Sequence, residues 1–205
     1  RRVLFRSETR DFPAGHPYHN VVAMPDDSPL PPIWLLGSSD YSAELAAQVG
    51  MGFAFAHHFA THDAIAAMTN YRAHFKPSGW RATPQSILAV AVVAADTDAE
   101  AEQLALSMDL NRLRRDRGQY LPLPSVEEAE AYPYTDAERA SIARNRARLF
   151  VGSPATVMAK LEPLIAASQA DELMVITAVY DHAARKKSYS LLAEAFGLAK
   201  RVAAS

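Results

Sequence analysis

The sequence predicts an α/β fold built on a parallel sheet, and the stretch from residue 33 to 59 carries this prediction. A short apolar run at 33–37 ends in Gly37. Next comes a segment with alanines at helical spacing, which stops at Gly50. A second apolar run at 52–56 then shows no polar alternation. Near-continuous apolar strands that flank a helix are typical of a parallel sheet covered on both faces.

The alternation of strand and helix continues along the chain. Runs rich in Val, Ile and Leu predict further strands at 86–94 and 172–177. Apolar spacing and terminal signals predict helices between these strands and after them. The expected helices cover residues 40–49, 63–75, 96–117, 126–131, 135–150, a segment opening at 153, and 188–196.

Cap residues set the expected starts of these helices. Thr97 and Thr135 each precede a glutamate by three residues, which is the pattern of a capping box. Ser153 precedes a proline at the first helical position. The helix at 63–75 is expected to be capped by Thr61 or His62.

A hydroxyl-rich turn joins the first strand to the first helix. It contains Gly37, Ser38, Ser39 and Ser42. A helix start has free N–H groups and the positive end of the helix dipole, so it attracts an anion such as phosphate. A simpler interpretation is that Ser39 or Asp40 only caps the helix.

Two adjacent histidines, His57 and His58, follow the second strand. Side chains alternate along a strand, so one is expected to point inward and the other outward. They could line a pocket, or loop backbone could satisfy both of them. A metal site with His62 is disfavoured, because neighbouring histidines on a strand face opposite ways. We therefore expect no metal site.

Composition excludes several classes of function. The chain has 205 residues, 49% of them hydrophobic, with seven histidines, no cysteine and a net charge of −2. Absence of cysteine removes thiolate chemistry and suits a cytoplasmic protein. The weak negative charge argues against a nucleic-acid partner. No apolar run approaches the ~20 residues that span a bilayer, so no membrane partner is expected. We interpret four arginines between 112 and 117 as favourable charge near a helix end.

The first 32 residues do not share the strand and helix pattern. Residues 1–7 are basic and resemble translated adaptor DNA, so we expect a non-native leader there. Residues 8–32 are rich in proline and predict an extended linker segment. The α/β part is therefore expected to cover residues 33–205.

Several motifs of the chain, taken in order, resemble the C-terminal half of the luciferase-like flavin-dependent monooxygenases. They are Trp34-Leu-Leu-Gly-Ser-Ser, Ser42-Ala-Glu-Leu-Ala-Ala-Gln, Phe53-Ala-Phe-Ala-His-His-Phe, Val92-Val-Ala-Ala-Asp-Thr-Asp-Ala-Glu-Ala, Val151-Gly-Ser-Pro, Asp171-Glu-Leu-Met-Val-Ile-Thr and Tyr180-Asp-His-Ala-Ala-Arg.

The resemblance implies a partial TIM (β/α)8 barrel, with about four parallel strands from its C-terminal half. Eight strands normally need ~250 residues, more than this chain has. An open half barrel exposes two sheet edges, so we expect marginal stability or self-association.

The resemblance also implies a cofactor and its site. The cofactor would be reduced FMN from a separate flavin reductase, used with oxygen on a small organic substrate. Ser39 and Ser42 would hold the flavin phosphate, with Gly37 and Ser38 shaping the turn. Ala56, His57 and His58 would line the pocket of the flavin ring.

Two other functions fit the same resemblance. One is a reductase that uses the deazaflavin F420. The other is a flavin-binding or dimerisation module without catalysis, and a homodimer is compatible with either. The sequence identifies no catalytic residue, and the chain by itself is expected to be inactive.

Overall fold

The structure is a computed structural model that describes residues 11–22, 24 and 31–198. The chain divides into two units, residues 1–33 and 34–205. In the first unit, the described residues form turns, and Phe12 stacks on His16 with ring centroids 4.7 Å apart. The expected leader at 1–7 lies outside the described residues.

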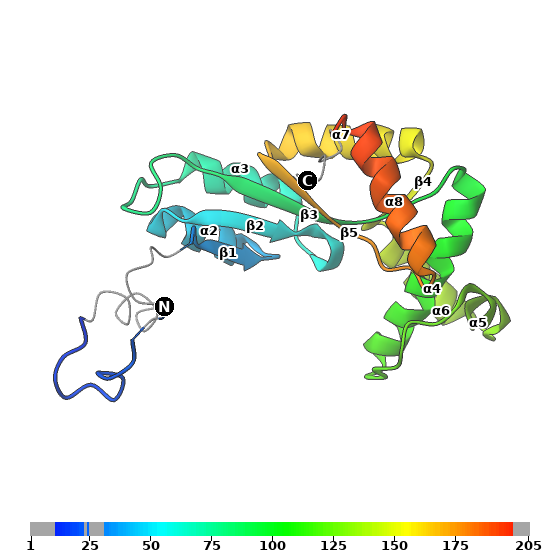
Figure 1. The fold of residues 1–205 in the computed structure, drawn as a ribbon, viewed down its shortest axis with the longest axis horizontal. Helices are drawn as coiled ribbons and strands as arrows, with labels where there is room; N and C mark the ends of the chain where they lie inside the picture. Colours follow the sequence, from blue (N-terminus) through cyan, green and yellow to red (C-terminus); the bar gives the residue numbers. More distant parts are fainter. Residues whose placement is uncertain (1–10, 23, 25–30, 199–205) are drawn as a thin grey trace, which may run out of the picture. The chain divides into compact units, whose positions relative to one another are not determined.

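The second unit alternates strands and helices in the predicted α/β order (Figure 1). The strands are β1 (Trp34–Gly37), β2 (Gly52–Ala56), β3 (Ser86–Ala94), β4 (Leu149–Gly152) and β5 (Glu172–Ile176). The helices are α2 (Asp40–Val49), the 3-10 turn η1 (His57–Phe59), α3 (Ala64–Ala73), α4 (Asp98–Asp116), α5 (Val126–Ala131), α6 (Asp136–Arg146), α7 (Pro154–Ser168) and α8 (His182–Ala195).

All strand pairs are parallel, and β3 is the centre of the sheet. Backbone groups of successive strand residues point to opposite edges. The backbone of Gln85 bonds to β2, and the backbone of Ala95 bonds to the end of β4. The backbone of Ser86, in contrast, bonds to the residue before β5. Strands β2 and β4 therefore share one edge of β3, along its first and second halves, and β5 lies on the other edge.

Strand β4 corrects the sequence prediction, which placed these residues in a helix extending to about 150. Helix α6 ends at Arg146 instead. Leu149 and Val151 then pack against α4, and the N–H of Ala95 bonds the carbonyl of Gly152. A four-residue strand is stable here because a long-range partner, the second half of β3, supplies its hydrogen bonds.

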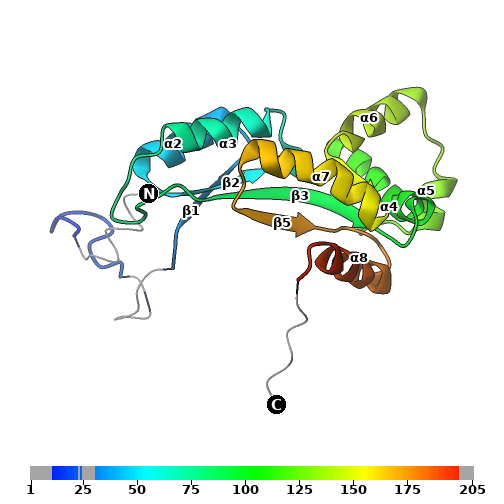
Figure 2. The ribbon, with the colours of Figure 1, turned by 90° about the horizontal axis from the view of Figure 1, so that it is seen from above.

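One face of the sheet carries the main core. Phe53 and Phe55 of β2 and Leu88 and Val90 of β3 are fully buried there. They pack against small or apolar residues of α2, α3 and α7, together with Leu192 of α8. Figure 2 shows α2, α3 and α7 along the same side of the strands. The helical apolar spacing in the sequence thus becomes the layer that covers the sheet.

The opposite face of β1 and β5 is not covered in this way. Leu36 is 68% exposed, and Met174 and Ile176 are 57% and 46% exposed. Their strand neighbours Leu35 and Val175 point the other way, into the main core. Because parallel sheets are normally covered on both faces, this exposure fits an incomplete barrel.

Caps determine where most helices begin. Thr97, Thr135 and Ser153 accept bonds from the backbone N–H three residues later, as predicted. Two predictions were wrong. Helix α3 is capped by Asp63, whereas the sequence had predicted Thr61 or His62. Helix α8 starts at His182, six residues before the predicted start, because Asp181 caps it.

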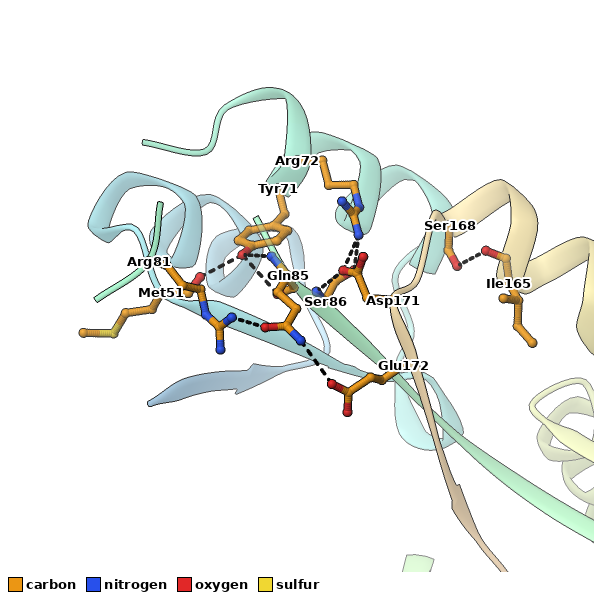
Figure 3. Close-up of polar contacts among 10 residues, drawn as sticks. All are labelled: Met51, Tyr71, Arg72, Arg81, Gln85, Ser86, Ile165, Ser168, Asp171 and Glu172. Carbon is orange, nitrogen blue, oxygen red and sulfur yellow. Dashed lines mark hydrogen bonds and ion pairs between the residues drawn. The ribbon is translucent and has the colours of Figure 1, made fainter. Parts of the chain in front are cut away.

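Polar contacts join α3 to the starting ends of β2, β3 and β5 (Figure 3). The buried Tyr71 hydroxyl donates to the Met51 carbonyl at 2.8 Å and accepts from the Gln85 N–H at 3.1 Å. Asp171 accepts from the Ser86 N–H at 2.7 Å and forms an ion pair with Arg72. These contacts hold the ends of strands that are far apart in sequence.

Candidate functional site

The candidate site begins at the turn between β1 and α2. A Cβ atom on Gly37 would lie 1.9 Å from the Ser42 hydroxyl and 2.3 Å from the Ser42 Cβ. Any side chain at position 37 would therefore displace Ser42. Glycine at this position lets the start of α2 approach the end of β1.

Ser39 and Ser42 face each other across this turn. Their hydroxyl oxygens are 3.1 Å apart, and the Ser42 hydroxyl donates to the Ser39 carbonyl, also at 3.1 Å. Since the Ser42 proton is used in that bond, Ser39 is the donor between the two hydroxyls. Both residues are half-buried. The structure thus brings together the two residues predicted to hold a phosphate.

The start of α2 differs from the other described α-helices. Ser39 occupies the N-cap position with extended backbone, but its side chain makes no cap hydrogen bond. Asp63, Thr97, Ser125 and Asp181 do cap their helices, as do Thr135 and Ser153. Among the described residues, the first N–H groups of α2 therefore receive no hydrogen bond from a side-chain cap. This arrangement is suited to an external anion.

The predicted ring-pocket residues lie at the matching end of the neighbouring strand. Strands β1 and β2 are parallel, with Gly37 opposite Phe55. The serine turn and Ala56–His58 consequently lie at the same, carboxyl-terminal edge of the sheet. Ala56 is 1% exposed, while both histidines are half-buried.

His58 has a structural contact. Its Nδ1 lies 3.2 Å from the Ala89 carbonyl, and a carbonyl can only accept, so Nδ1 carries the proton. Arg112 donates to the His58 carbonyl at 2.6 Å. Through the bond to Ala89, the His58 side chain contacts the edge of β3 between the end of β2 and the start of β4.

His57 is held differently. Its Nδ1 is buried and has no hydrogen-bond partner among the described residues. The ring packs against Phe150 of β4 in a tilted arrangement, with centroids 5.7 Å apart. Burial lowers the pKa of His57, and the nearby His58 and Arg148 lower it further. Both effects favour the neutral form of the imidazole.

Two arginines near η1 were not identified as site residues from the sequence. Arg112 reaches the His58 carbonyl from α4, and Arg148 donates to the Ala60 carbonyl at 2.9 Å. Burial, followed by the charge of Arg148, lowers the pKa of Arg112. Arg112 is thus half-buried and hydrogen-bonded. The sequence had indicated only a favourable charge near a helix end. Sequence separations of 54 and 88 residues left no local signal for these contacts.

No group of three His, Cys, Asp or Glu side chains in ranges 11–22, 24 and 31–198 is arranged to hold a metal ion. No helix in that part of the chain has the length and apolar character needed to cross a membrane.

Comparison with known proteins identifies the family. The sequence model described as "Luciferase-like monooxygenase" matches residues 1–172. The chain is 40% identical over 188 residues to the uncharacterized protein YceB of Bacillus subtilis (strain 168), covering 92% of this chain and 57% of that protein. It is 36% identical over 182 residues to the luciferase-like monooxygenase of Escherichia coli (strain K12), covering 88% of this chain and 54% of the relative.

Solved structures match the fold of the chain. The crystal structure of apo-MsnO8 matches with a TM-score of 0.81 and 35% identity, over 97% of this chain and 59% of that one. The monooxygenase RslO1 from Streptomyces bottropensis, at 19% identity and a TM-score of 0.52, shares the fold. It covers 85% of this chain and 50% of that one.

The parallel sheet and its helices are those of a partial α/β barrel, as predicted from the sequence. The chain belongs to the luciferase-like monooxygenase family. It spans about half the length of the curated relatives it matches.

Proposed function

We propose that this chain is the C-terminal part of a flavin-dependent monooxygenase that uses reduced FMN and oxygen on a small organic substrate. A separate flavin reductase would supply the reduced cofactor. The observation that carries the proposal is the start of α2, where Ser39 and Ser42 bond to each other and leave the helix N–H groups without a side-chain cap.

The residues of this turn fit a phosphate group. Gly37 lets the backbone come close, and the half-buried hydroxyls of Ser39 and Ser42 can turn from each other to an anion. Backbone N–H groups at the first turn add donors along the helix dipole. Ser38 completes the turn between strand and helix. The chain's own groups would thus hold the phosphate without a basic side chain.

The neighbouring strand would supply the wall of the flavin-ring pocket. Ala56 ends β2 with a small side chain, and next to it His57, whose neutral form is favoured, has an Nδ1 without a partner among the described residues. His58 would position η1 through its bond to Ala89. When bound, reduced FMN would supply the reaction with oxygen, while the protein orients the reactants and excludes water.

Binding of FMN and of riboflavin, which lacks the phosphate, tests this proposal by calorimetric titration of the full chain. We expect FMN to bind more tightly than riboflavin. Ser39→Ala or Ser42→Ala should each weaken FMN binding by about 10- to 100-fold and leave riboflavin binding almost unchanged, because a hydrogen bond to a charged group contributes ~1.5–3 kcal/mol.

The exposed Ser190 of α8 provides the matched control, and Ser190→Ala should bind FMN as the unchanged protein does. Equal affinity for FMN and riboflavin would refute the phosphate site. If the chain bound F420 tightly and did not bind FMN, the cofactor would be assigned as the deazaflavin and not as FMN.

A further inference from the structure

A second pocket lies away from the serine turn, between α4, α6, β4 and the middle of α7. Its volume is about 490 Å³, within the range of small-molecule sites. Each element contributes side chains from one face. Leu106, Ile142, Leu149 and Val151 form the apolar part of the lining.

Arg146 forms ion pairs with the two carboxylates that line this pocket. This arginine contacts the buried Asp109 at 2.8 and 2.9 Å and Glu102 at 3.1 Å. Asp109 is only 6% exposed, and burial raises its pKa against the effect of Arg146. The two carboxylates therefore already have a cationic partner, and they are poorly placed to attract a second cation.

Two other cations, Arg139 and Lys160, line the pocket and form no ion pair among the described residues, although the charge of Lys160 acts on the more distant Asp98 carboxylate. Arg139 lies over the ring of Tyr134, with its guanidinium carbon 5.4 Å from the centroid. Lys160 donates to the Val151 carbonyl at 3.3 Å, which is a long bond. Within the described part of the chain, no carboxylate lies within ion-pair distance of either. Together with Arg146, these residues make three cations in the pocket lining, against two carboxylates.

The hydroxyl of Tyr134 provides an independent observation. It is buried, it lies in a residue that lines the pocket, and it has no hydrogen-bond partner among the described residues. Most buried polar groups are paired, and leaving one unpaired costs ~1–3 kcal/mol. An acceptor atom inside the pocket would satisfy this donor.

From this geometry we infer that the pocket between α4, α6, β4 and α7 binds a small amphipathic carboxylate. Its carboxylate oxygens accept from the Tyr134 hydroxyl and pair with Arg139 or Lys160. Its apolar part contacts Leu106 and Ile142 and the side chains of β4. This site is separate from the proposed flavin site and needs no flavin.

Binding of 3-phenylpropionate to the full chain tests the inference, with 3-phenylpropanol and 3-phenylpropylamine as neutral and cationic matches. We expect the carboxylate to bind at least about tenfold more tightly than either match. Arg139→Gln, Lys160→Gln and Tyr134→Phe should each weaken carboxylate binding several-fold to tenfold, and leave alcohol binding much less affected.

Arg144→Gln is the matched control, since Arg144 is an exposed arginine of the same helix and does not line the pocket. Its affinity for the carboxylate should stay within twofold of the unchanged protein. Circular dichroism confirms that each variant is folded before it is titrated. Equal binding of alcohol and carboxylate, no binding of 3-phenylpropionate, or equal losses in Arg144→Gln and Arg139→Gln would overturn the inference.

Discussion

Replacement of Tyr71 by phenylalanine removes one hydroxyl from the junction of α3 with β2 and β3. The Tyr71 side chain is fully buried. Its hydroxyl donates to the Met51 carbonyl at 2.8 Å and accepts from the Gln85 N–H at 3.1 Å (Figure 3). The ring itself packs against Phe53 and Phe75, with centroid distances of 5.4 and 5.7 Å. Phenylalanine keeps the ring and loses only the hydrogen bonds.

The expected cost follows from the two backbone groups left without a partner. Met51 is 4% exposed, so its carbonyl has little access to water, whereas Gln85 is half-buried and can be solvated in part. A buried polar group without a partner costs ~1–3 kcal/mol. We therefore expect Tyr71→Phe to lower the free energy of unfolding by about 2 kcal/mol. For a chain of this size the same change lowers the Tm by ~4–8 °C.

Urea unfolding followed by circular dichroism measures this difference, provided that the slope m is unchanged between the proteins. Tyr41→Phe makes the same chemical change at a side chain that is 74% exposed. This control should stay within ~0.5 kcal/mol of the unchanged protein. If Tyr71→Phe also stays within that limit, the hydroxyl does not hold the strand ends together, and the reasoning is refuted.

Two other substitutions test the turn before α2 and the start of α6. Gly37→Ala should lower the free energy of unfolding by ~1–3 kcal/mol, because its Cβ overlaps Ser42. The double variant with Ser42→Gly should recover much of the loss in the same urea assay, and no recovery would contradict the steric cause. At Glu138, hydrogen bonds from the Thr135 N–H and hydroxyl lower the pKa to about 2. The folded-state pKa lies below that of the unfolded chain, so this stabilisation is present above about pH 4.5 and is lost as the pH falls toward 2. The stability difference between Glu138→Gln and the unchanged protein should therefore shrink between pH 6 and pH 3, and a constant difference would show that the charge of Glu138 is not responsible.

Local features of the chain could be predicted from the sequence because their partners lie within a few residues. Thr135 and Glu138 form the predicted capping box, and Ser153 caps α7. Ser39 and Ser42 meet because residues three apart at a helix start are neighbours in space. The apolar runs of β2 and β3 have the predicted bounds, since their composition alone marks them as buried strands.

Tertiary structure alone decided the features that depend on distant partners. Strand β4 exists because the second half of β3 pairs with it, and its run of four residues is too short to be distinguished from the end of a helix by sequence alone. Arg112 and Arg148 surround η1 through contacts with distant carbonyls. The pocket beside Tyr134 requires four elements to converge. Hydrogen bonds and apolar periodicity act over a few residues and can be read along the chain, whereas the choice among distant partners depends on which packing buries the most apolar surface and leaves the fewest polar groups unpaired.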